Sequence, residues 1–259
     1  MCLAVVALDA HPAFALVIAA NRDEFHARAA APAAWGDAPP FTRILAGRDL
    51  EAGGTWLGVR RDGRWALVTN VREGGRHDPA ARSRGELVPD VLNAPCRTAD
   101  ALHAYAAAGE RYNGFNLLAG DAARAHWISN RGGGPARLAG GLHGLSNALL
   151  DTPWPKVERG KTAVAAALEL PDEGALVERL FAHLADRTGA VDSELPDTGV
   201  GIERERWLAP AFIANERYGT RSSTVVLVGR DGKVLLAERS FGIGGVPLGR
   251  VEHRFALAD

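Results

Sequence analysis

Residues 1–24 read MCLAVVALDA HPAFALVIAA NRDE, and this opening stretch decides the fold. It holds two short apolar runs, residues 2–8 and 15–20, which have the length of buried strands and meet at a His11-Pro12 turn. The first run is almost continuously apolar, so we expect it to lie inside a sheet that is covered on both faces. The chain is therefore predicted to begin with a hairpin of a central sheet.

The remaining sequence alternates between strand pairs and helices. Asp-Gly turns predict hairpins over residues 55–69 and 223–238, the second of which closes the fold. A further strand pair is expected at 115–119 and 125–129, and loops at 31–43 and 132–147. Helices are predicted from Ser83 towards Leu92, over 98–108, over 155–170 and over 175–185. This order predicts one α+β domain spanning residues 1–259, with mostly antiparallel sheet covered by helices.

Composition narrows the class of protein. The chain has 259 residues, 47% of them hydrophobic, and a formal net charge of -1, which argues against broad capture of nucleic acid. No apolar run approaches the roughly 20 residues of a membrane span, and no secretory signal is recognised. Only three lysines accompany many arginines, a bias typical of a GC-rich bacterial genome. We expect a cytoplasmic protein with a small-molecule partner.

The chain contains two cysteines, Cys2 and Cys96, which we expect to be free thiols in a reducing compartment. Removal of Met1 would expose Cys2 with both a thiol and an α-amine, whose pKa near ~8 lets the amine act as a built-in base. The alternative is that Cys2 is only a small apolar residue at the start of a strand. Cys96 has no partner motif and is expected to be inert. The eight histidines show no paired metal-ligand spacing, so no metal is predicted.

Polar residues follow several predicted strands. Residues 21–24, Asn-Arg-Asp-Glu, come directly after the second apolar run, where charges are costly unless they are paired. Asn70 follows another strand, and Asn147 follows Gly-Leu-Ser; their amides are suitable donors to an oxyanion. Taken singly, each of these features also fits a solvated loop or a turn.

Together these residues resemble the NRDE family, also called the transport and Golgi organization protein 2 family. Beyond the NRDE run, the resemblance is carried by motifs in family order along nearly the whole chain: GGTWLG (53–58), TN (69–70), SRG (83–85), YNGFN (112–116), GLSN (144–147), PWPK (153–156) and TRSST (220–224).

The family in turn resembles the N-terminal nucleophile hydrolases of the choloylglycine hydrolase and penicillin acylase branch. That resemblance implies a four-layer αββα sandwich of two mostly antiparallel sheets. It also implies that Cys2 is nucleophile and base, with Arg22 favouring the thiolate and Asp23 holding the α-amine. The remaining implied site residues, which would contact the oxyanion or the amine or complete a charged wall, are Asn70, Asn147 and Arg221.

One departure concerns Arg22 and Asp23, which are adjacent here, whereas these hydrolases place two residues between them. Neighbours on a strand point to opposite faces. Both side chains can therefore reach one site only if the strand has ended or bulged there.

Two functions follow. The first is an amidohydrolase that cleaves a linear C–N amide of a small acylated substrate through a thioester on Cys2. The second, suggested by the family's association with haem and acyl-CoA or lipid handling, is a non-enzymatic carrier in which arginine forks hold carboxylates or phosphates. No cofactor is expected under the first; under the second any haem contact would be non-covalent, because no C-x-x-C-H occurs. A purely structural module fits the polar strand ends least well.

Overall fold

The structure is a computed structural model that describes residues 3–132 and 134–258. Its strands form two antiparallel sheets. The first sheet, in spatial order, consists of β10 (Gly141–Leu145), β1 (Leu3–Leu8), β2 (Phe14–Phe25), β11 (Tyr218–Gly229), β12 (Lys233–Phe241) and β13 (Pro247–Ala256). The second consists of β3 (Ala30–Trp35), β4 (Ile44–Asp49), β5 (Leu57–Arg60), β6 (Trp65–Asn70), β7 (Phe115–Gly120), β8 (Ala125–Ser129) and β9 (Ala136–Arg137).

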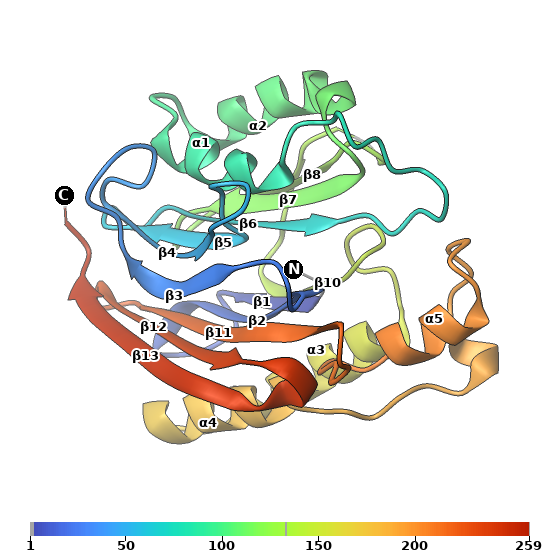
Figure 1. Ribbon diagram of the computed structural model, residues 1–259. Helices are drawn as coiled ribbons and strands as arrows, with labels where there is room; N and C mark the ends of the chain where they lie inside the picture. The colour runs from blue at the N-terminus through green and yellow to red at the C-terminus, as the bar shows by residue number, and fades with distance from the viewer. Residues whose placement is uncertain (1–2, 133, 259) are drawn as a thin grey trace.

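Helices cover the outer face of each sheet, which gives four layers (Figure 1). Helices α1 (Leu87–Asn93) and α2 (Thr98–Ala107) pack on the second sheet. Helices α3 (Pro155–Ala167) and α4 (Glu173–Leu184) pack on the first. A short helix, α5 (Ile202–Leu208), lies beside them at one end of the sandwich. The predicted α+β four-layer sandwich is confirmed.

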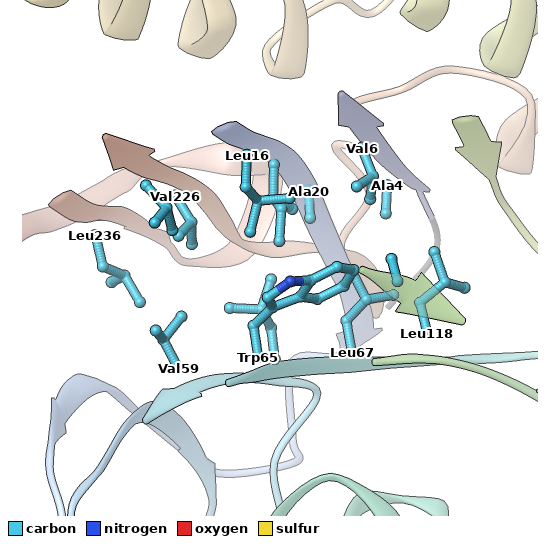
Figure 2. Packing of buried hydrophobic residues seen from close by; sticks show 14 of the residues in the cluster. Ala4, Val6, Leu16, Ala20, Val59, Trp65, Leu67, Leu118, Val226 and Leu236 are labelled. Carbon is cyan, nitrogen blue, oxygen red and sulfur yellow. The ribbon is translucent and has the colours of Figure 1, made fainter. Parts of the chain in front are cut away.

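The core between the sheets follows from the two-residue period of the strands. On β1, β2, β11 and β12, even-numbered side chains such as Ala4 and Ile18 point inward, while odd-numbered ones such as Val5 and Val17 pack under the helices. Trp65 and other side chains of the second sheet fill the space opposite (Figure 2). β1 lies between β10 and β2 and all six of its residues are buried, as the apolar opening of the chain predicts.

Several strand boundaries differ from the sequence prediction. β2 does not end before residues 21–24 but runs on to Phe25, because β11 pairs with it along that whole stretch. The predicted loop at 31–43 contains β3, an edge strand that accommodates Pro32 at an irregularity in its pairing with β4. β13 extends the first sheet beyond the hairpin that was expected to close the fold.

The helix predictions hold closely. Ser83 caps the segment before α1, since its Oγ accepts a hydrogen bond from Gly85 N at 3.3 Å, although the first turn is 3-10 (η1, Arg84–Glu86). α2, α3 and α4 lie where helices were expected, with ends that differ by at most three residues. Among the described residues, the α-helix and strands that the sequence did not predict are α5, β3, β4, β9, β10 and β13.

Candidate functional site

The polar run that continues β2 presents its side chains alternately to the two faces of the first sheet. Asn21 points to the helical side, where its Nδ2 donates to Leu184 O and Ala211 O, both at 2.7 Å. Arg22 points between the sheets and Asp23 returns to the helical side. Asn21 is therefore a structural member of the run, and Arg22 and Asp23 are its candidate functional members.

Arg22 is a buried cation with loose ionic partners. Its side chain is 4% exposed, and its Nη2 lies 3.7 Å from Glu24 Oε2 and 3.8 Å from Asp49 Oδ2. The guanidinium carbon lies 4.5 Å from the centre of the Trp56 ring, a cation–π arrangement. Burial lowers the pKa of Arg22, against the opposing effect of Glu24 and Asp49. Within the described part of the chain, Arg22 Nη1 has no hydrogen-bond partner, so this donor is available to an anion.

Asp23 is buried at 3% exposure and accepts a hydrogen bond from Thr220 Oγ1 at 2.7 Å. Thr220 reaches it because β11 bulges at Arg221, which shifts the register between Thr220 and Ser222. β2 itself neither ends nor bulges at Arg22 and Asp23. The sequence required an end or a bulge of β2 itself, and this requirement is not met: the side chains of Arg22 and Asp23 leave opposite faces of the sheet, and the bulge lies on β11.

Asn70 and Asn147 form a linked pair across two elements. Asn147 Nδ2 donates to Asn70 Oδ1 at 2.9 Å and to Asn70 O at 3.2 Å, so Asn147 spends both amide hydrogens on its partner. Arg72 holds Asn147 from the other side, with its Nη2 3.2 Å from Asn147 Oδ1. Asn70 Nδ2 donates to no other described residue. Within the pair Asn147 is the donor and positions Asn70, which leaves Asn70 Nδ2 as the amide that can donate to a ligand.

Arg221 occupies the bulge and ties backbone segments together. Its Nη1 lies 3.1 Å from Phe25 O, 3.2 Å from His26 O and 2.9 Å from Arg28 O, and its Nε lies 3.3 Å from Phe241 O. These contacts fix the turn that follows β2. The main role of Arg221 is therefore to hold the backbone beside Arg22 in place.

A cavity of about 430 Å³ lies at this end of the sandwich, and we call it the polar cavity. Its lining includes Arg22, Asp23, Asn70 and the Trp56 ring. Arg221 lines a different cavity on the other side of Arg22. Trp56 lines both cavities, whereas Trp154 packs near Leu3.

Three sequence predictions concern thiols, metals and membranes. Cys2 lies outside the described residues. Cys96 is a free, exposed thiol. In the described ranges, no group of three or more His, Cys, Asp or Glu side chains could hold a metal ion. None of the described helices combines the length and apolar character needed to cross a bilayer.

Glu238 was missed by the sequence analysis. This inward-facing residue of β12 is 2% exposed, and its carboxylate accepts from Ala33 N at 2.8 Å and Thr224 Oγ1 at 3.0 Å, so it links β12 to the edge strand β3. Burial raises the pKa of Glu238 to about 7, although these two hydrogen bonds and Arg22 oppose the shift.

This raised pKa predicts a pH-dependent stability difference for Glu238→Gln. The folded state holds the Glu238 proton more tightly than the unfolded chain, so the wild type loses stability as pH rises from the unfolded value towards 7. Glutamine keeps the acceptor for Ala33 without ionising. We expect its free energy of unfolding, relative to wild type, to rise by about 3 kcal/mol between pH 4.5 and 8. Urea unfolding across that range measures it, with exposed Glu194→Gln as control; parallel pH curves for Glu238→Gln and wild type would contradict the assignment.

The fold and site together define an α+β sandwich with a polar cavity at the strand end where β1 begins. The Transport and Golgi organisation 2 family matches residues 1–242, and the chain belongs to that family. It is 38% identical over 265 residues to the Bos taurus Transport and Golgi organization protein 2 homolog, covering 93% of each chain. It is 30% identical to the Drosophila melanogaster Transport and Golgi organization protein 2, covering 93% of this chain and 92% of that protein. A Caenorhabditis elegans N-acylethanolamine-hydrolyzing acid amidase ortholog shows 13% identity and a TM-score of 0.48, over 87% of this chain and 92% of that one.

Proposed function

We propose that the chain is an N-terminal-nucleophile amidohydrolase, in which Cys2 attacks a linear amide of a small acylated substrate after Met1 is removed. The observation that carries this proposal is the convergence of polar groups on the start of β1. Leu3 pairs with Asn21, so β1 begins beside the polar run of β2.

Amide hydrolysis by this route needs a thiolate, a group that carries the proton, and a hydrogen-bond donor to the oxyanion. The α-amine of Cys2 takes the thiol proton, and the buried guanidinium of Arg22 favours the thiolate. The sulfur then attacks the carbonyl carbon, and the C–N bond breaks as the ammonium returns its proton to the leaving amine. Water cleaves the resulting thioester, which releases a carboxylic acid and restores the thiol.

The described residues fit the remaining roles. Asn70 Nδ2 has no other described acceptor and lines the polar cavity, so it can donate to the developing oxyanion. Asn147 positions Asn70 through the two hydrogen bonds at 2.9 and 3.2 Å. Asp23, already hydrogen-bonded to Thr220, is the carboxylate proposed to hold the α-amine.

Chromogenic acyl esters and acyl anilides test this proposal. We expect a burst of released chromophore equal to the concentration of protein that begins at Cys2, followed by slower steady turnover, because a thioester accumulates before water cleaves it. Protein that retains Met1 serves as the matched control and should give no burst. Equal release by the two forms would overturn the proposal.

The second candidate function is non-enzymatic binding of haem or acyl-CoA, and the unpartnered Nη1 of buried Arg22 favours it. Both ligands carry oxyanions that match a guanidinium fork. Titration of purified protein with haem, followed by absorbance, and with acyl-CoA, followed by calorimetry, tests it. Saturable binding of either supports a carrier, and failure of both to bind removes this candidate.

A further inference from the structure

A second cavity adjoins the polar cavity on the other side of the Arg22–Trp56 pair. It has a volume of about 360 Å³ and lies between β3 and the strands β11, β12 and β13; we call it the β13 cavity. Its apolar lining includes Pro32, Phe241 and Val251, and Leu248 at its edge is 65% exposed. Arg22 and Trp56 belong to the linings of both cavities, so these two residues form part of a shared wall.

Two buried polar atoms in the lining of the β13 cavity lack partners. Arg22 and Ser222 are each 4% exposed, and neither Arg22 Nη1 nor Ser222 Oγ has a hydrogen-bond partner among the described residues. The two residues are directly opposite each other in the β2–β11 register, on the inward face. Buried polar groups are normally hydrogen-bonded, so two orphaned donors side by side point to a ligand.

The charge of the cavity favours an oxyanion. Three arginines contribute to its lining, Arg22, Arg221 and Arg250. Arg221 binds backbone carbonyls and Arg250 pairs with Glu178 and Glu252, so Arg22 is the arginine whose guanidinium keeps a donor for a ligand. The one carboxyl group in the same lining is Glu238, whose oxygens already accept hydrogen bonds from Ala33 N and Thr224 Oγ1. A guanidinium beside a hydroxyl donor matches the geometry of a carboxylate or phosphate. The apolar walls suit an aliphatic stem attached to that group.

We infer that the β13 cavity is a ligand subsite that binds a carboxylate or phosphate group on an aliphatic stem, with Ser222 and Arg22 holding the oxyanion. This inference deepens the proposed function, because it rests on a ligand being held at Arg22. It does not require hydrolysis by Cys2.

Adjacent serines of β11 give a matched pair of variants. Ser222 Oγ is unpartnered on the inward face, whereas Ser223 Oγ, on the helical side, donates to Asn21 Oδ1 at 2.6 Å. Ser222→Ala therefore removes a ligand contact and no internal hydrogen bond. Ser223→Ala removes an internal hydrogen bond and no ligand contact. Ser222→Ala should therefore weaken ligand binding without lowering stability, and Ser223→Ala should lower stability without weakening ligand binding.

The test is calorimetric titration with octanoate and with octyl phosphate, using octanol as the neutral probe, together with thermal unfolding. We expect saturable binding of at least one anion, weakened about tenfold in Ser222→Ala, because a hydrogen bond to a charged group is lost. The unfolding temperature of Ser222→Ala should equal or exceed that of wild type. Ser223→Ala should bind like wild type and unfold at a lower temperature.

The outcomes separate this inference from the hydrolase proposal. Binding by octanoate alone or octyl phosphate alone identifies which oxyanion is held. Cys2→Ala should bind the anionic probe as tightly as wild type does. Binding by this variant shows that the subsite exists whether or not Cys2 hydrolyses a substrate. Equal binding of octanol and the anions, no saturable binding of either anion, or full affinity in Ser222→Ala would each overturn the inference.

Discussion

Replacement of Cys2 by alanine is expected to lower amide hydrolysis by at least about 10⁴-fold, because the variant lacks the atom that forms the thioester. Alanine is as small as cysteine, so Met1 is still removed and the α-amine is still exposed. The measurement is kcat/KM with an acyl anilide, on protein whose N-terminus has been verified by mass.

Cys96 provides the control for this variant, since it is the only other cysteine of the chain and its thiol is free and exposed. It lies beside Arg64 and Arg124, in a cavity separate from the polar cavity. Cys96→Ala should hydrolyse at the wild-type rate. A Cys2→Ala variant that keeps its rate would show that any hydrolysis occurs elsewhere.

Replacement of Asn70 by alanine is expected to lower kcat by about 10²- to 10³-fold with little change in KM, because an oxyanion donor acts mainly in the transition state. Asn147→Ala should lower kcat less, since Asn147 acts only by holding Asn70 through its amide. Both variants are measured with the same acyl anilide, alongside their unfolding temperatures.

Asn113 is the matched control for Asn70. It also lines the polar cavity, but its side chain is already bound to the backbone of Asp78, through Nδ2 to Asp78 O at 2.8 Å and Oδ1 to Asp78 N at 2.9 Å. Asn113→Ala should therefore leave kcat nearly unchanged. An Asn70→Ala variant with wild-type kcat, or one that is impaired only in KM, would contradict the oxyanion role.

The fold was predictable where local signals were strong. Apolar runs, Asp-Gly turns and helix-start residues located the opening hairpin, the β5–β6 and β11–β12 hairpins and four helices. β3 was missed because Pro32 usually signals a loop, and only its position on a sheet edge permits it. The extension of β2 was missed because buried polar residues in a strand depend on partners from distant elements, such as Thr220 for Asp23.

The candidate site was predictable in part. The motifs located Arg22, Asp23 and Asn70, which the structure brings to one cavity. The motifs did not show which residues can donate a hydrogen bond to a ligand and which only hold other residues in place. That distinction depends on which atoms of Asn147 and Arg221 are already hydrogen-bonded within the protein. Ser222 carried no readable signal, because residues 220–224 are all polar and residues 225–228 are all apolar, so the sequence does not show which face Ser222 occupies. Its inward position follows from the pairing of β11 with β2 after the bulge at Arg221.

The intact mass of the protein during turnover shows whether Cys2 is the nucleophile. A Cys96→Ser protein that begins at Cys2 is mixed with a reactive acyl ester and quenched with acid within the burst. We expect a mass increase of one acyl group, mapped to Cys2 and removed by hydroxylamine as a thioester. Substrate consumption with Cys2 unmodified at every quench time would contradict it.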